Sequence, residues 1–329
     1  MKPGRMLWWP VFALALTATT LACAGEQAPP KHKSAVVLAM FGTTVEPAIE
    51  GLLNIRKQIR RAYPETPVRI AFTSNIIRRI WQKRAKDPDY ARKHPGVPAD
   101  ILEVQGPLAT IANLQDRGFD DIVVQPTHIS LGEEYLDLSA YVKALASIET
   151  IKKKFKPFHS LVIGRPAFGT FGKTRPYSED ILTVVKALAE DAGAASREGA
   201  ALVYMGHGND YFPSGGAYLQ FEREMRQTYP RVKTFIGTVE GFPAFTDVLV
   251  KLKESGVKKV LVKPFMTVAG DHARNDMAGP EPDSWKSMLE KEGFTVIPVL
   301  RGLGEQDAFA RVFVSHLADT AADAGIVLK

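Results

Sequence analysis

Short runs rich in β-branched residues alternate with amphipathic segments along almost the whole chain. Ala35–Met40 is such a run, and the segment after it repeats apolar residues at helical spacing through Leu52, Ile55 and Ile59. The further candidate strands are Val68–Phe72, Ile122–Gln125, Leu161–Gly164, Ala201–Met205, Val232–Ile236, Val260–Lys263 and Val296–Val299. This alternation predicts an α/β fold in which helices cover both faces of parallel sheets.

The alternation is written twice, and the two halves match at several positions. An offset of 164 residues pairs Gly42 with Gly206 and Val68 with Val232. Around the third strand the offset is 138 residues, and it pairs Pro126 with Pro264, Gly132 with Gly270 and Glu134 with His272. The smaller offset places an extra segment in the first half, at about residues 74–105.

We therefore predict two similar doubly wound domains with parallel four-stranded sheets that face each other across a cleft and are related by internal duplication. The expected N-terminal α/β domain spans residues 34–176, and the expected C-terminal α/β domain spans residues 177–329.

The first residues read as a processing segment. Lys2 and Arg5 precede the uncharged apolar run Leu7–Ala22, and Ala22-Cys23-Ala24 places small residues where signal peptides are cut. We expect a signal peptide over residues 1–24, a linker over residues 25–33, and a periplasmic protein with no stable membrane span in its mature form. An uncleaved anchor and a lipoprotein held through Cys23 are the alternatives. Because Cys23 is the only cysteine, cleavage would leave no thiol for disulfides or metal binding.

The net charge of the chain limits which classes of molecule it is expected to bind. The formal net charge of +6 does not indicate nucleic acid, but it is compatible with an acidic small molecule. Candidate cations for such a substrate are Arg78, Arg79, Lys263 and Arg274. The sequence has no P-loop and no G-x-G-x-x-G that opens a helix after a strand, so we expect no nucleotide.

Three polar residues follow predicted strands of the second half: His207, Glu240 and His272. Two imidazoles and a carboxylate suit a borderline divalent metal. Binding groups of open α/β sheets gather at the carboxyl ends of the strands. The trio therefore predicts a metal held in the cleft.

The first half offers further candidates. His128 follows the third predicted strand, so it should face the cleft, and Glu133 and Glu134 come shortly after it. The other histidines have structural interpretations: His316 lies on the apolar stripe of the last helix, and His159 begins a strand. His32 belongs to the linker and His94 to the exposed extra segment.

Four motifs in order and spacing resemble one family. They are Met205-Gly-His-Gly208, Thr238-Val-Glu-Gly241, Ala269-Gly-Asp-His-Ala273 and His128-Ile-Ser-Leu-Gly-Glu-Glu-Tyr135. Together they resemble the anaerobic-type sirohydrochlorin cobaltochelatases, a class II chelatase family, and the resemblance runs from about Ser34 to the last helix. The signal peptide departs from this pattern, because sirohydrochlorin is made in the cytoplasm.

The resemblance implies an enzyme of cobalamin and porphyrin biosynthesis, a lyase that inserts a divalent metal into sirohydrochlorin without a nucleotide. It implies that His207, Glu240 and His272 contact the metal, and that one of them accepts pyrrole protons. Co²⁺ is the expected metal substrate and Fe²⁺ the alternative. His128, Glu133, Glu134, Arg78 and Arg274 are the expected tetrapyrrole-binding residues.

Two other functions fit the same residues. A periplasmic metal-binding protein without catalysis would also have two α/β lobes and His/Glu ligands, and a metal-dependent hydrolase would use Asp271 as its base. The residues leave open a homo-oligomer and a haem bound through His94 or His128.

Overall fold

Two four-stranded parallel sheets organise the computed structural model, which describes residue 1, residues 32–210 and residues 214–329. The first sheet has the order β2-β1-β3-β4, and the second has the equivalent order β6-β5-β7-β8. The strands are β1 (Ser34–Met40), β2 (Val68–Phe72), β3 (Asp121–Pro126), β4 (Ser160–Ile163), β5 (Ala201–Gly208), β6 (Thr234–Glu240), β7 (Lys259–Phe265) and β8 (Thr295–Pro298). The duplicated α/β fold predicted from the sequence is confirmed.

The predictions for the N-terminus concern mostly residues that the structure does not describe. Residues 2–24 of the expected signal peptide and residues 25–31 of the expected linker lie outside the described residues. No helix in the described part of the chain is long and apolar enough to span a membrane.

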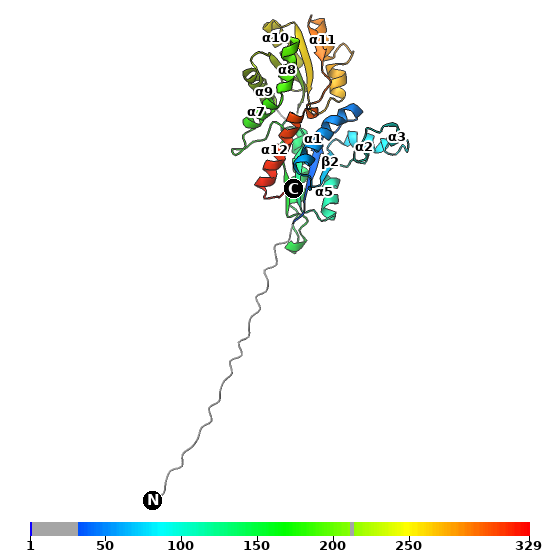
Figure 1. Ribbon diagram of the computed structural model, residues 1–329, viewed down its shortest axis with the longest axis vertical. Coiled ribbons are helices and arrows are strands. Elements are labelled where there is room, and N and C mark those ends of the chain that lie inside the picture. Colours follow the sequence, from blue (N-terminus) through cyan, green and yellow to red (C-terminus); the bar gives the residue numbers. More distant parts are fainter. Residues whose placement is uncertain (2–31, 211–213) are drawn as a thin grey trace. The chain divides into compact units, whose positions relative to one another are not determined.

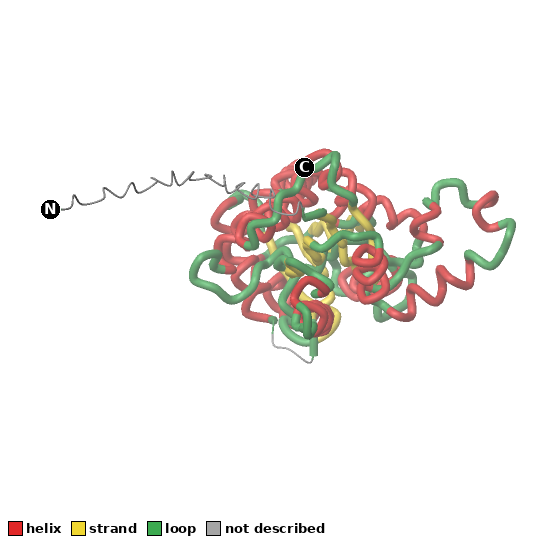
Figure 2. The backbone as a smooth tube through the Cα atoms, turned by 90° about the horizontal axis from the view of Figure 1, so that it is seen from below, coloured by secondary structure: helices red, strands yellow, loops and turns green. Residues whose placement is uncertain are grey.

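Helices cover both faces of each sheet, and Figure 2 shows the yellow strands lying among red helices. Those of the first half are α1 (Ile49–Ala62), α5 (Pro107–Asp116) and α6 (Glu133–Ala146). Those of the second half are α7 (Tyr177–Ala187), α8 (Ala189–Glu198), α9 (Gly215–Thr228), α10 (Phe245–Ser255), α11 (Trp285–Lys291) and α12 (Asp307–Asp323).

Alternation along the central strands divides the core. In β1, Ala35 and Val37 pack with α5 and α6, whereas Val36 and Leu38 face α1 and α12. The cluster that holds Val36 continues without a break to Leu202 of the second sheet. The inner faces of both sheets therefore belong to one hydrophobic core.

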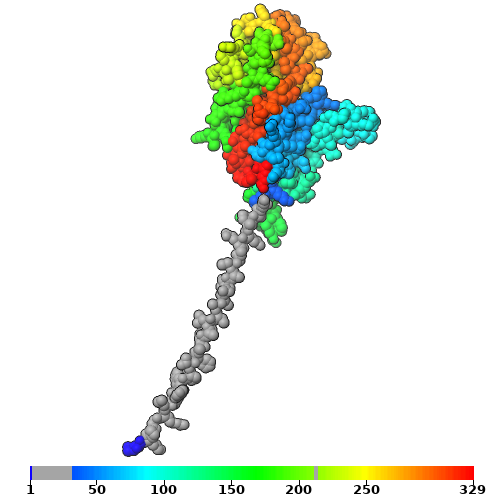
Figure 3. Space-filling model, viewed as in Figure 1, coloured from blue at the N-terminus to red at the C-terminus, as the bar shows by residue number. Residues whose placement is uncertain are grey.

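The last helix crosses back to the first half. Helix α12 packs against α1 and β3, and Phe309 and Phe313 are fully buried there. Figures 1 and 3 show this red helix lying against the blue start of the fold. Beyond it, the Lys329 carbonyl accepts hydrogen bonds from the Glu65 and Thr66 amides, each at 2.9 Å. Helix packing thus does not divide at residue 176, and the domain limits stay a prediction.

Strand pairing corrects the alignment of the two halves. Val36 pairs with Val123, and Leu202 pairs with Leu261, which is the residue that the offset of 138 assigns to Val123, so the first strands are related by an offset of 166 residues. Gly42 then corresponds to Gly208, and both have positive φ, at 99° and 79°. The predicted equivalence of Gly42 and Gly206 is wrong by two residues. An error of two keeps every side chain on the same face of the sheet, so hydrophobic pattern alone cannot detect it.

The extra segment forms a lobe between β2 and α5. It consists of α2 (Asn75–Arg84), α3 (Tyr90–Lys93) and α4 (Ala99–Leu102), and its cyan helices project from the rest in Figure 1. In the second half only a short turn separates β6 from α10. Trp81 anchors the lobe, because its ring is fully buried and its Nε1–H donates to the Thr43 carbonyl at 2.8 Å.

Candidate functional site

A cleft of about 1020 Å³, partly open to solvent, lies at the carboxyl ends of the central strands of both sheets. Its walls come from residues 41–44 after β1, 127–130 after β3, 207–209 at the end of β5, and 266–268 and 270–272 after β7. In each sheet these two strands lie where the strand order reverses, which is where open α/β sheets bind their ligands.

His207 reaches the cleft because β5 and β6 approach each other closely at their ends. Gly208 pairs with Glu240, and a Cβ at Gly208 would lie 1.8 Å from the Glu240 carbonyl oxygen. Only glycine permits this approach, and its φ of 79° also favours glycine. The approach leaves His207 Nδ1 3.9 Å from the Glu240 Oε2 atom.

His272 enters from the loop after β7. It stands at the start of the π-helical turn η3 (Ala273–Met277), and its Nδ1 lies 2.5 Å from Asp276 Oδ2, four residues on. The His272 and His207 rings meet nearly at right angles, with centroids 4.9 Å apart and an interplanar angle of 86°. Two imidazoles from separate strands thus share one wall of the cleft.

Both rings have an oxygen beside Nδ1, which indicates their tautomer. His207 Nδ1 lies 3.1 Å from the Gly208 carbonyl oxygen, and a carbonyl only accepts. His207 Nδ1 therefore donates, and the Asp276 carboxylate assigns the same role to His272 Nδ1. In the neutral rings the lone pair then lies on Nε2, which is the arrangement of metal-binding histidines.

Glu240 is less closely associated with the cleft than the two histidines are. Its side chain is 46% exposed, and the residue does not line the cleft. Nor do the three side chains meet the compact spacing of a preformed site, in which one ligand atom from each residue lies within 4.8 Å of the others. Within the described ranges, that spacing occurs only for His32, Asp121 and His159, which belong to the first half of the chain and are not part of the predicted trio. The structure places His207 beside both His272 and Glu240, and only the two histidines line the cleft.

His128 faces the cleft, as expected from its place after β3. The residue keeps some exposed surface, but both ring nitrogens are buried, and neither has a hydrogen-bond partner. Burial lowers the pKa of His128 from 6.5 to about 4, so the ring is neutral at pH 7. Buried polar atoms rarely stay unpaired, and these two are suited to a ligand in the cleft.

The other predicted substrate-binding residues are dispersed. Glu134 lines the cleft, whereas Glu133 is exposed outside it. Arg78 uses its guanidinium on the Phe72 and Thr73 carbonyls and on the Asn75 side chain, outside the cleft lining.

Arg274 lies two residues after His272 and also outside the lining, with its Nε buried and unpartnered. Lys263 is not a rim cation: its side chain is 2% exposed and its Nζ donates to Asp191 Oδ1 at 2.6 Å. That expectation was wrong because strand position alone cannot reveal a carboxylate 72 residues away.

Sequence reasoning missed two residues of the site, Asp276 behind His272 and Tyr218 in the cleft lining. Asp276 was detectable, because it lies four residues after His272 on a helical turn. Tyr218 lies on the cleft floor and is 2% exposed. Its burial raises its pKa, against the opposite effect of hydrogen bonds with Ser130 and Gly208. Its position on the apolar stripe of α9 makes it look like any core residue.

Comparison with known proteins places the chain in a family. The model of the family described as cobalt chelatase (CbiK) matches residues 34–322. The chain therefore belongs to the cobalt chelatase family. A sirohydrochlorin cobaltochelatase, CbiKC, of Nitratidesulfovibrio vulgaris is 31% identical over 292 residues, which cover 89% of this chain and 92% of the relative. A sirohydrochlorin cobaltochelatase of Salmonella typhimurium is 29% identical, over an alignment that covers 87% of this chain and 95% of the relative.

Solved structures agree at the level of fold. SirB from Bacillus subtilis with Fe³⁺ aligns with a TM-score of 0.57 and 14% identity, over 89% of this chain and 97% of that one. The sirohydrochlorin chelatase SirB from Bacillus subtilis subspecies spizizenii in complex with cobalt aligns with the same coverage, a TM-score of 0.54 and 14% identity. These likenesses support the two-sheet architecture.

Proposed function

We propose that this protein is a chelatase that inserts a divalent metal into sirohydrochlorin without a nucleotide, with Co²⁺ as the preferred metal and Fe²⁺ as the alternative. One observation carries the proposal. His207 and His272 stand side by side at the cleft, and each has Nδ1 bonded to an oxygen and Nε2 left for a metal. The curated relatives carry this activity in their names.

Different residues bind the metal and the macrocycle. His207 and His272 present the metal through Nε2, and the exposed Glu240 side chain turns toward the ion to complete the ligand set. Three ligands leave open positions for the ring nitrogens of the tetrapyrrole, so the ion can be transferred. The flat macrocycle packs between the walls formed by Phe41, Ile77 and Ile129.

Insertion also moves protons. Each turnover exchanges one divalent ion for two pyrrole N–H protons, so the charge of the complex balances only if bases accept both. As the metal leaves, the Nε2 lone pair of His207 or His272 becomes free to take a proton. His128, neutral and unpartnered across the cleft, offers a hydrogen-bonding nitrogen to the macrocycle.

The test is the absorbance change of sirohydrochlorin with Co²⁺ or Fe²⁺. We expect His207→Ala and His272→Ala to lower the initial rate at least 100-fold, which is the scale for losing a group that acts in the transition state. Thermal midpoints should stay unchanged, because both side chains are partly exposed. His94→Ala, on the projecting lobe, is the control and should keep the wild-type rate.

The same assay separates a chelatase from a metal-binding protein. A binding protein would retain Co²⁺ and leave the sirohydrochlorin spectrum unchanged. Wild-type rates in both histidine variants would refute the assigned metal site.

We also propose that residues 1–24 direct export to the periplasm. The support is the order of Lys2 and Arg5, the apolar run, and the small residues that end at Ala24. Intact-mass analysis of protein from its native host should show a chain that begins at residue 25. A lipid-modified Cys23 would instead indicate a lipoprotein, and a full-length chain in the cytoplasm would refute export.

A further inference from the structure

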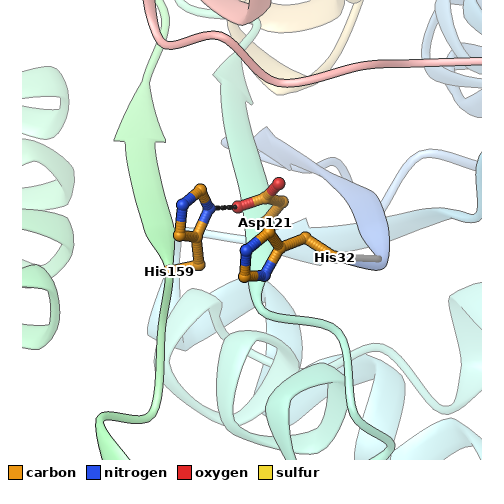
Figure 4. A group of neighbouring side chains, drawn as sticks. All are labelled: His32, Asp121 and His159. Atoms are coloured by element: carbon orange, nitrogen blue, oxygen red, sulfur yellow. Dashed lines mark hydrogen bonds and ion pairs between the residues drawn. The ribbon is translucent and has the colours of Figure 1, made fainter. Parts of the chain in front are cut away.

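A second group of metal-binding side chains lies at the opposite end of the first sheet, away from the cleft. Asp121 begins β3, and His32 and His159 come shortly before β1 and β4. These three strands are neighbours: Ser34 pairs with Asp121, and Asp121 pairs with Ser160. Parallel pairing therefore brings the three side chains together at the amino ends of the strands, as Figure 4 shows.

The group is compact. One ligand atom from each of His32, Asp121 and His159 lies within 4.8 Å of the other two. The two imidazole rings are stacked, with centroids 3.6 Å apart and an interplanar angle of 11°. Asp121 Oδ1 lies 2.6 Å from His159 Nδ1, and the Asp121 side chain is only 7% exposed.

Asp120 holds one of the rings from outside the group. Its Oδ2 lies 2.6 Å from His32 Nδ1, and its Oδ1 accepts from the Lys33 amide at 2.9 Å. A carboxylate that occupies one nitrogen of an imidazole orients the other nitrogen toward a metal. His32 thus has the same supporting contact that Asp276 gives to His272.

We propose that His32, Asp121 and His159 bind a divalent transition-metal ion at a site separate from the cleft. The ligand set of two imidazoles and one carboxylate suits Zn²⁺, Co²⁺, Ni²⁺ or Cu²⁺. This inference does not depend on the proposed chelatase activity, because no residue is shared with the cleft.

The proposal requires only small movements. Bonds of about 2.0–2.1 Å place the donors of a tetrahedral site about 3.4 Å apart. The side chains of His32 and His159 are 32% and 53% exposed, so their rings can rotate toward the ion. The ion replaces the proton between His159 and Asp121, and that proton leaves to solvent. Because His32 precedes the first strand, the bound ion would tie the entry of the chain to β3 and β4.

The experiment uses full-length protein with His207→Ala and His272→Ala, so that the cleft histidines do not contribute. Calorimetric titration with Zn²⁺ should show one equivalent, and Co²⁺ should give visible d–d absorption. Adding His159→Gln or His32→Gln should weaken Zn²⁺ binding at least tenfold, the lower end for a disturbed metal site. His94→Gln is the matched control, because His94 also pairs with a carboxylate, Glu46, at 2.9 Å.

The outcomes are separable. If Zn²⁺ affinity changes less than twofold in both His159→Gln and His32→Gln, the proposal is wrong and the residues form ordinary ion pairs. His159→Gln in the otherwise wild-type chain should keep the sirohydrochlorin insertion rate. A failure of chelatase activity in the wild type would leave the Zn²⁺ titration as an independent result.

Discussion

At the scale of single residues, Asp276 controls which nitrogen of His272 is available. The carboxylate accepts from Nδ1 and is 47% exposed, so it orients the ring without taking part in the core. An amide at this position could donate as well as accept, and it would no longer select one tautomer.

We therefore predict that Asp276→Asn lowers the metal-insertion rate 10- to 100-fold, the usual effect of losing a carboxylate behind a metal-binding histidine. The thermal midpoint should not move. Initial rates across a Co²⁺ series measure the effect, and Asp283→Asn, an exposed carboxylate in the same half, is the control. A wild-type rate in Asp276→Asn would mean that the ring is oriented by something else.

His128 should give the fold a distinct pH dependence. Its pKa is about 4 in the folded protein and 6.5 as the ordinary value, so only the unfolded chain takes up this proton between those limits. The free energy of unfolding should then fall as pH drops from about 6.5 to about 4, by about 3 kcal/mol in total.

Urea denaturation at a series of pH values tests this. His128→Phe removes the titrating group and should flatten the dependence in that window, whereas His94→Gln should leave it in place. An equal slope in wild type and His128→Phe would show that His128 is solvated.

At the scale of elements, the end of β5 depends on glycine. A Cβ at Gly208 would collide with the Glu240 carbonyl and with Thr238, so the two strand ends could not stay in register. Gly256, which ends α10, has a similar φ of 70°, yet nothing lies within 4 Å of a Cβ there.

We predict that Gly208→Ala destabilises the protein by about 2–5 kcal/mol, since strain at positive φ adds to overpacking. Gly256→Ala should cost about 1–2 kcal/mol, from the strain alone. Urea midpoints of the two variants measure the difference. Similar losses in both would mean that the contact with Glu240 relaxes freely.

The elements also show what sequence can predict. Apolar runs and helical stripes locate the strands and helices, because they record which faces are buried. Strand ends place His128, His207 and His272 at the cleft, because parallel strands present their carboxyl ends together. Three features depend on distances between segments, which the pattern does not carry: the buried Lys263–Asp191 pair, the position of Glu240 outside the cleft lining, and the Gly42–Gly208 match.

Sequence pattern also could not show that His32 and His159 lie close together. Each had a structural interpretation when taken alone, and only strand pairing brings them to one carboxylate. Residues that lie far apart in the chain and before their strands, rather than after them, give no signal in a search of strand ends.

At the scale of the whole molecule, one hydrophobic core joins the inner faces of both sheets. Val36 and Phe313 belong to the same buried cluster as Leu202 and Phe221. We therefore predict that the two halves unfold in one cooperative transition.

Trp81 and Trp285 report on the two halves separately. In chains that begin at residue 25, Trp285→Phe leaves Trp81 as the probe, and Trp81→Phe leaves Trp285. In each variant the fluorescence transition should coincide with loss of helical circular dichroism. Fluorescence that changes before or after the dichroism would show that the halves unfold independently.

The return of α12 to the first sheet also has a consequence during synthesis. Part of the inner face of β1 and β3 is covered by α12, which is made after every strand of both sheets. N-terminal domains generally fold first as the chain emerges. Here α1 covers part of the inner face of the first sheet, and the rest stays exposed until residues 307–323 have been made. The first sheet is therefore incomplete during most of synthesis, which favours chaperone binding to its exposed apolar face.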